Sequence, residues 1–248
     1  MPQATSRTYS RPPITEAIID IRIAAAVTDV DQKKVVERLK RRYPHSQPTH
    51  EVSINFTGFA LGVTQSAAGY RVTTDEQTDV VLVMPQGLAT ARLAPYQGWP
   101  LLRDHARKAW EAWRQETPHQ PVSRIGIRYI NRLDVPVDNR AVIRIEDYLT
   151  LYPHLPAIDA RPMLGYMMET VIPLSAPDWV ATVRSALLTP PPIPKYVSLL
   201  LDFDVFRTAD LPRKEDDLWH LVETGRDIKN GIFEACITDE ARKLFNDE

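Results

Sequence analysis

The 248-residue sequence is 44% hydrophobic and 25% charged, and it carries a formal net charge of −2 at pH 7. This composition is that of a folded globular protein, and the near-neutral balance excludes a strong general attraction to nucleic acid or to anionic membranes. The single cysteine, Cys236, excludes an internal disulfide, and no segment approaches the roughly 18 apolar residues that a membrane span requires. With no signal-peptide pattern near Met1, we expect a cytoplasmic protein.

The first half of the chain predicts strands around two helices. Residues 1–11 are polar and lack apolar periodicity, so we expect a mobile tail, followed by a strand over 14–26 in which apolar side chains alternate. Thr28 and Asp31 have the spacing of a capping box, and the helix they begin ends before Pro44. The next elements are four strands and a helix, near 51–57, 69–75, 79–84, 87–94 and 99–115. The predicted unit 12–118 is βαββββα.

The second half repeats this order. It predicts a long strand, a short helix and three further strands, over 122–137, 145–151, 163–174, 179–188 and 196–206. A C-terminal helix follows, with apolar positions from Leu218 to Ala235, and a further short helix lies over 238–245. Gly225 falls on the buried stripe of the C-terminal helix, where a glycine costs up to about 1 kcal/mol, so we expect close packing against a neighbour there. The predicted unit 119–248 is βαβββα.

These patterns predict an α+β fold. Apolar and polar residues alternate within the strands, which favours antiparallel sheets with helices on one face. The similar element order of 12–118 and 119–248 suggests two successive βαβₙα units that form a pseudo-duplicated single domain. Whether the two halves share one sheet is left open by the sequence.

The strongest candidate site is a row of arginines in the strand over 122–137. Arg124, Arg128 and Arg132 share one strand face in steps of four residues, about 13 Å at 3.3 Å per residue. Guanidinium groups match phosphate and carboxylate oxygens bidentately, so this row is a candidate binding site for a phosphorylated ligand or a nucleic-acid backbone. The structural alternative is cross-strand ion pairing with the acidic faces of two other strands, Glu16 and Asp20 or Asp202 and Asp204.

Asp202 and Asp204 also suggest a metal site. Two carboxylates two residues apart on a strand are candidate Mg²⁺ ligands for phosphoryl transfer assisted by the arginines. No nucleophile or water-positioning histidine accompanies them. The six histidines have no zinc-site spacing, and Cys236 is expected to be a buried structural thiol.

Catalytic signatures are missing from the sequence. There is no G-x-G-x-x-G, G-x-x-x-x-G-K-[ST], H-E-x-x-H or G-x-S-x-G motif, and only 9 glycines are present against 21 prolines. Phosphate-binding loops use glycine where the backbone must approach the ligand. We therefore assign no catalytic residue and predict no cofactor.

Several segments resemble one known family. They are the opening Pro13-Ile-Thr-Glu-Ala-Ile18, the Pro95–Trp99 step, the strand Arg124–Arg132, the segment Leu201-Asp-Phe-Asp-Val-Phe206 and the late Lys229–Phe233. Together they resemble a sporadically distributed prokaryotic family of uncharacterised proteins of similar length. The resemblance covers nearly the whole chain but transfers no activity and no site residues. Patchy distribution is typical of genes that travel with mobile elements or defence systems.

Three functional hypotheses follow from the sequence. The first is a non-enzymatic accessory or binding protein that acts with a protein partner encoded nearby, for example in a bacterial defence or mobile-element module. The second is a phosphate- or nucleic-acid-binding protein that uses the arginine row, and the third is a metal-dependent phosphoryl-transfer enzyme. A homo-oligomer is compatible with each, and the sequence does not identify the partner or ligand.

Overall fold

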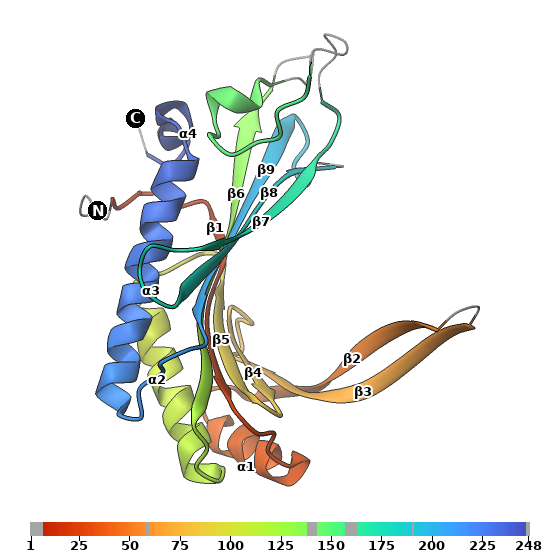
Figure 1. The fold of residues 1–248 in the computed structure, drawn as a ribbon, viewed down its shortest axis with the longest axis vertical. Helices are drawn as coiled ribbons and strands as arrows, with labels where there is room; N and C mark the ends of the chain where they lie inside the picture. The colour runs from red at the N-terminus through yellow and green to blue at the C-terminus, as the bar shows by residue number, and fades with distance from the viewer. Residues whose placement is uncertain (1–6, 58–59, 138–142, 157–162, 190, 247–248) are drawn as a thin grey trace. The chain divides into compact units, whose positions relative to one another are not determined.

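The structure is a computed structural model that describes residues 7–57, 60–137, 143–156, 163–189 and 191–246. Within these ranges it contains one sheet of nine strands in the order β2-β3-β4-β5-β1-β6-β9-β8-β7, accompanied by helices (Figure 1). The pairings described from β2 to β5 and from β6 to β7 are antiparallel, which confirms the α+β class. No helix in the described ranges is long and apolar enough to cross a membrane.

The chain divides into two compact units, which we describe separately. Unit 2 comprises residues 18–93 and 97–124, and unit 1 comprises residues 1–17, 94–96 and 125–248. Strand β1 (Ile14–Ile23) begins in unit 1 and continues into unit 2 after residue 17. Strand β6 (Val122–Pro136) begins in unit 2 and continues into unit 1 after residue 124.

Unit 2 contains four consecutive antiparallel strands and two helices. The elements are α1 (Asp29–Leu39), β2 (His45–Thr57), β3 (Ala60–Thr73), β4 (Asp79–Met84), β5 (Gly87–Leu93) and α2 (Trp99–Glu116). The predicted cap of α1 is present, with the backbone N–H of Asp31 donating to Thr28 Oγ1 at 3.2 Å. One face of α2 is buried, and its three tryptophans, Trp99, Trp110 and Trp113, are all buried.

Two strands of unit 2 are longer than the sequence pattern predicts. β2 begins at His45 instead of 51, and β3 begins at Ala60 instead of 69. Polar residues and Pro48 interrupt the apolar alternation in β2. The strand continues because its backbone pairs with β3, and an edge strand tolerates a proline on its unpaired side.

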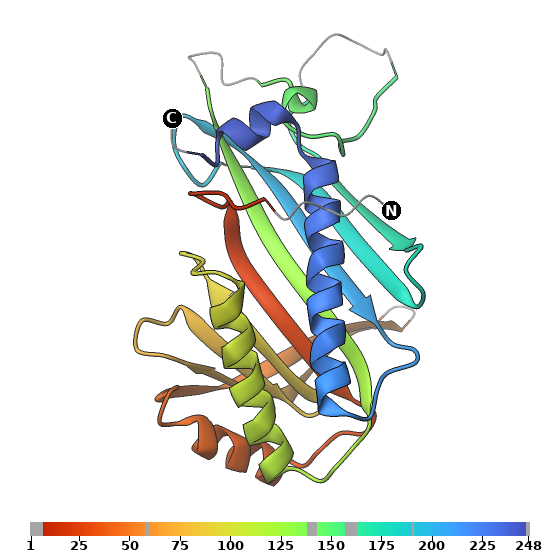
Figure 2. The ribbon, with the colours of Figure 1, turned by 90° about the vertical axis from the view of Figure 1, so that its left-hand side faces the viewer.

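Unit 1 contains the other four consecutive antiparallel strands and the long C-terminal helix (Figure 2). Its further elements are the 3₁₀ turn η1 (Ile145–Asp147), β7 (Met167–Pro173), β8 (Trp179–Leu188), β9 (Tyr196–Arg207), α3 (Glu215–Cys236) and α4 (Asp239–Lys243). The helix predicted over 145–151 is only this 3₁₀ turn. After it the chain leaves the helical path, because Leu149 bridges to Ile237 and the N–H of Thr150 donates to the carbonyl of Cys236.

Helix α3 covers the apolar face of β6 and β9. Leu199, Leu201, Phe203 and Val205 of β9 are fully buried on this face. A Cβ atom on Gly225 of α3 would lie 2.5 Å from Ile127 Cδ1 and 2.8 Å from the ring of Trp179, far inside normal contact. The predicted reason for this glycine is confirmed, because only a residue without a side chain lets the helix approach the sheet so closely.

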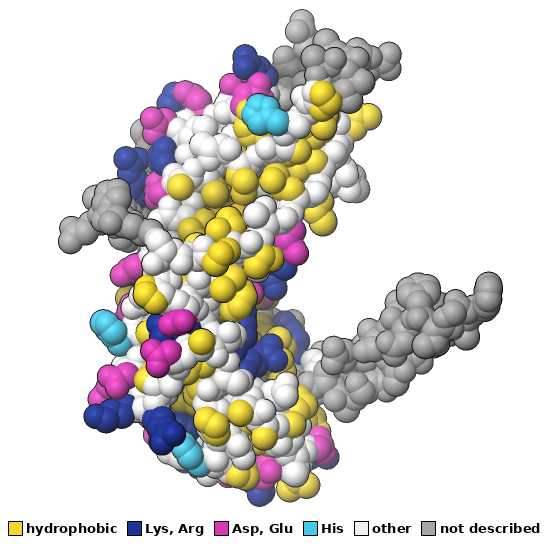
Figure 3. Space-filling view, in the orientation of Figure 1, with side chains coloured by type: hydrophobic (Ala, Val, Ile, Leu, Met, Phe, Trp, Pro, Cys, Tyr) yellow, Lys and Arg dark blue, Asp and Glu magenta, His cyan; other side chains and the backbone are white. Residues whose placement is uncertain are grey.

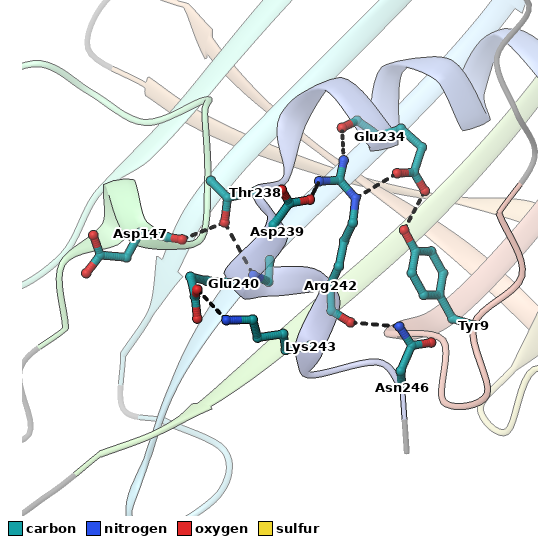
Figure 4. A network of polar contacts seen from close by, with 10 residues as sticks. Tyr9, Asp147, Glu234, Thr238, Asp239, Glu240, Arg242, Lys243 and Asn246 are labelled. Atoms are coloured by element: carbon teal, nitrogen blue, oxygen red, sulfur yellow. Dashed lines mark hydrogen bonds and ion pairs between the residues drawn. The ribbon is translucent and has the colours of Figure 1, made fainter. Parts of the chain in front are cut away.

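The described part of the predicted tail, residues 7–11, is attached to α3 and α4 (Figure 4). The hydroxyl of Tyr9 donates to Glu234 at 2.6 Å, and Arg242 binds the other carboxylate oxygen of Glu234 at 3.1 Å. The Tyr9 ring packs edge-on against Phe245, with ring centroids 5.4 Å apart. Polar composition does not predict this attachment, because it depends on one aromatic ring meeting an apolar surface formed by the opposite end of the chain.

Candidate functional site

The three arginines proposed from the sequence lie on β6, and each guanidinium contacts a carboxylate. Arg124 binds Asp20, Arg128 donates to both oxygens of Asp202 at 2.8 and 2.7 Å, and Arg132 binds Asp134 at 3.0 Å. Because Ile127 faces α3, the alternation of the strand directs Arg128 to the opposite face of the sheet. All three partners are side chains of this chain, which is the arrangement expected for structural ion pairs.

Asp202 is the centre of a row of charges across four strands of unit 1. Its carboxylate is 3% exposed and also accepts from Arg184 of β8 at 3.1 Å, and Arg184 in turn binds Glu169 of β7 at 2.5 Å. The hydrogen bonds from Arg128 to Asp202 raise the pKa of Arg128 above its usual value. The positive charge of Arg128 is therefore already used within the sheet.

The structure does not assemble the metal site suggested for Asp202 and Asp204. Asp204 pairs in register with Arg128, and Asp202 accepts from two guanidiniums. Within the described ranges, no group of three or more histidine, cysteine or acidic side chains has a geometry that could hold a metal ion. A carboxylate that already accepts hydrogen bonds from two arginines is a poor ligand for a divalent cation, so we do not propose this site further.

Among the described residues, strand β7 is an open edge of the sheet, and β8 is its one neighbour in the strand order. The N–H of Leu174 donates to Trp179, and the carbonyl of Tyr166 accepts from Leu187, so even-numbered residues bond towards β8. In an antiparallel strand, the alternate residues direct both backbone groups away from that neighbour. Met167, Glu169 and Val171 therefore present their N–H and C=O groups at the edge.

The side chains along this edge are apolar and exposed. Met167 is 81% exposed and Val171 59%, while Leu164, just before the strand, is 85% exposed. Figure 3 shows hydrophobic side chains gathered over β7 and the segment that leads into it. Single exposed apolar residues are common, but several of them beside unpaired backbone groups are typical of a binding surface.

A cavity of about 670 Å³ adjoins the beginning of β7. Its apolar lining comes from the segment before β7 and from the end of β8, including Met163, Leu164, Leu187 and Leu188. Arg144, Glu146 and His154 supply polar groups at its wall. Since Met167 pairs with Ala186, the cavity lies directly beside the first residues of the edge strand. We call β7 together with this cavity the edge site.

Cys236, Lys229 and His105 are buried titratable groups that lie outside the edge site. Cys236 is buried as predicted, and burial raises its pKa to about 11, which leaves a protonated and unreactive thiol at neutral pH. Lys229 of α3 lies over the Tyr129 ring, with its amine 3.7 Å from the ring centroid, and burial lowers its pKa to about 7. His105 of α2 is buried beside Asp79, and burial lowers its pKa.

The edge site was missed by the sequence analysis, although its strand was predicted. The available signals were apolar residues on both strand faces, at Met167, Val171 and Ile172, together with Pro173 at the strand end. A strand with apolar residues on both faces is normally predicted to be buried inside the sheet. Only the strand order shows that β7 lies at the edge.

No protein-family model matches the sequence, and no curated protein sequence matches it. The resemblance to a prokaryotic family therefore remains a prediction.

Proposed function

We propose that this protein is a non-enzymatic binding protein that acts with a partner protein, and that an extended segment of the partner pairs with β7. The observation that carries the proposal is the combination at one edge of unpaired backbone groups, exposed apolar side chains and an apolar cavity. Addition of a strand to a sheet edge is a common mode of peptide recognition, in which backbone hydrogen bonds supply affinity and side-chain pockets supply specificity.

The chemistry of the edge defines the partner segment. Backbone groups are offered from Met167 to Val171, and Pro173 lacks the N–H that would continue the ladder. Glu169 is already bound to Arg184, so the edge offers apolar contacts and no free charge at that position. We therefore expect a short extended segment with apolar residues at alternate positions, one of which enters the cavity.

The biological setting is inferred from the sequence resemblance. Sporadic distribution supports a partner encoded by a neighbouring gene, in a bacterial defence or mobile-element module, and we place the complex in the cytoplasm. These assignments are associations and stand apart from the geometry of the edge.

The arrangement of the strands supports the predicted internal duplication. In the first half of the chain, strands β2 to β5 follow β1, and the last of them, β5, lies beside β1 in the sheet. In the second half, strands β7 to β9 follow β6, and the last of them, β9, lies beside β6. Each series ends in a long helix, α2 or α3. We propose that the two halves descend from one βαβₙα unit, with η1 in the place of α1.

A matched pair of proline substitutions tests the binding proposal. Val171→Pro removes an N–H that points away from β8, whereas Thr170→Pro removes one that bonds to β8. The probe is a phage-displayed library of random twelve-residue peptides, selected on the purified protein. We expect enriched peptides with alternating apolar residues, binding that is lost in Val171→Pro but retained in Val171→Ala, and slowed amide exchange at Met167, Glu169 and Val171 in the complex.

The control is Val30→Lys, which changes an equally exposed apolar residue of α1. It should bind the selected peptides like the unmodified protein, whereas Val171→Lys should not. Selected peptides that bind Val171→Pro with unchanged affinity, or no enrichment above an unrelated protein, would overturn the proposal.

A further inference from the structure

A second cavity, of about 440 Å³, lies in unit 2 where the end of α1 meets α2. Its lining is rich in basic residues, with Arg38, Arg41, Arg42 and Lys108 against one acidic residue, Glu111. None of these residues belongs to the edge site or to the arginine row of β6. Four cationic side chains around one small cavity indicate an anionic ligand. Whether a cation can bind that ligand depends on whether a carboxylate of the protein already contacts it.

Two of the four cations are already paired. Arg38 binds Glu116 at 2.8 Å, and Lys108 binds Asp104 at 2.7 Å. Both pairs lie at the surface, where such contacts contribute little and exchange readily. These two residues therefore supply a positive surrounding but are not the primary ligands.

Arg41 and Arg42 have no carboxylate partner among the described residues. Arg42 instead contacts Nε2 of the buried His105, and because a guanidinium only donates, Nε2 must accept. The proton of His105 then lies on Nδ1, which is 3.2 Å from Asp79. Burial lowers the pKa of His105, so the ring is neutral at pH 7 and supplies no counter-charge to Arg42.

The buried negative charge of Asp79, next to His105, is neutralised by an arginine. Asp79 also binds Arg92 at 3.0 Å, and all three groups, Asp79, Arg92 and His105, are buried. Arg42 is thus anchored at one end of its guanidinium by a neutral, buried ring. A side chain held in this way loses less conformational freedom when it binds a ligand.

Tyr43 lies beside Arg42 in the wall of the same cavity. The centre of its ring is 6.0 Å from the guanidinium carbon of Arg42, and its side chain is buried. Burial raises the pKa of Tyr43 to about 12, so the hydroxyl keeps its proton at neutral pH. Because the hydroxyl oxygen is closed to solvent, Tyr43 packs the wall of the cavity and offers no donor to a ligand.

We propose that this cavity binds a small ligand with a phosphate group, whose oxygens accept from Arg41 and Arg42. Guanidinium forks match phosphate geometry, and two adjacent arginines suit a dianion. A small ligand fits better than a nucleic-acid backbone, because the basic residues surround one cavity and the whole chain carries a net charge of −2.

The proposal is tested by the binding of inorganic phosphate and of pyrophosphate to the full-length protein. Calorimetry measures the affinity, and the NMR shifts of backbone amides locate the site. We expect saturable binding at 150 mM NaCl with shifts confined to the end of α1 and the facing part of α2. Arg41→Gln should weaken binding at least about tenfold, which corresponds to about 1.4 kcal/mol. Arg42→Lys should also weaken it, because lysine keeps the charge but not the fork that contacts both His105 and the phosphate.

Arg107→Gln is the matched control, since it removes one charge from α2 at a position that does not line the cavity. Its affinity for pyrophosphate should equal that of the unmodified protein. Arg41 has no partner among the described residues, so Arg41→Gln should fold normally even if Arg42→Lys is less stable. Absence of saturable binding, equal losses in Arg41→Gln and Arg107→Gln, or Arg41-dependent binding of a DNA duplex without binding of pyrophosphate would overturn the proposal.

Discussion

Arg128 donates to both carboxylate oxygens of Asp202, and Arg184 shares one of these oxygens at 3.1 Å. One buried carboxylate thus binds two guanidiniums from strands on either side of β9. The acidic group faces away from α3, on the face of the sheet that also carries Arg128 and Arg184. The relationship explains why aspartate is needed at position 202 without reference to a ligand.

We predict that Asp202→Asn lowers the free energy of unfolding by about 2 kcal/mol, because Arg128 loses the carboxylate that it contacts and Arg184 loses one of its two. Urea denaturation followed by circular dichroism measures the change. Asp210→Asn removes an exposed partner of Arg207 and should change the stability by less than about 0.5 kcal/mol. Equal effects of the two substitutions would contradict the special role of Asp202.

Gly225→Ala should destabilise the protein by about 1–3 kcal/mol, although alanine favours helices by about 1 kcal/mol, because the added methyl group overlaps Ile127 and Trp179. Thermal unfolding measures this balance. Ile127→Val removes the nearest atom, Cδ1, and should recover part of the loss when combined with Gly225→Ala. If Gly225→Ala raised the melting temperature, the close approach of α3 to the sheet would be wrong.

Lys229 makes stability depend on pH. Burial lowers its pKa from 10.5 to about 7, despite the contact with the Tyr129 ring, which favours the charged amine. Between these two values the unfolded state binds the extra proton, so the free energy of unfolding should rise as the pH increases from about 7 to 10.5.

Replacing Lys229 by methionine should remove that slope and stabilise the protein at pH 7 by about 1 kcal/mol, because an apolar side chain has no charge to desolvate. Denaturation at a series of pH values between 7 and 10 measures both effects. Lys40→Met changes an exposed lysine and should leave the slope intact. A slope that persists in Lys229→Met would have to arise from another group.

Tyr9→Phe should lower the free energy of unfolding by about 1 kcal/mol, because it deletes the hydrogen bond to Glu234 (Figure 4) and keeps the aromatic packing against Phe245. Burial and Glu234 raise the pKa of Tyr9 from 10 to about 12. Its contribution is therefore complete below pH 10 and is lost as the pH rises towards 12. Tyr148→Phe is the comparison, since it removes a tyrosine hydroxyl outside this network of contacts. Protection of the amide of Arg11, which donates to Phe245, reports separately on attachment of the segment.

Local patterns predicted most of the strands and the helices of this protein. Period-two alternation located β4, β5, β8 and β9 to within a residue or so, and the Trp110 and Trp113 stripe located α2, since these elements bury one face. The pattern failed over 145–151, where pairing of Leu149 with Ile237 replaces a helix. That outcome depends on a segment almost ninety positions away in the sequence, and no local window contains it.

For the candidate sites too, some features follow from the sequence and others only from the tertiary structure. The sequence by itself determined which residues carry chemistry, because arginines, aspartates and a two-sided apolar strand are visible in the residues. Only the tertiary structure decided how they are used: β9 brought Asp202 to Arg128, β7 was left at the edge of the sheet, and α2 brought a neutral His105 to Arg42. A charge is free or paired according to its neighbours in space, and those neighbours come from strand order and helix packing.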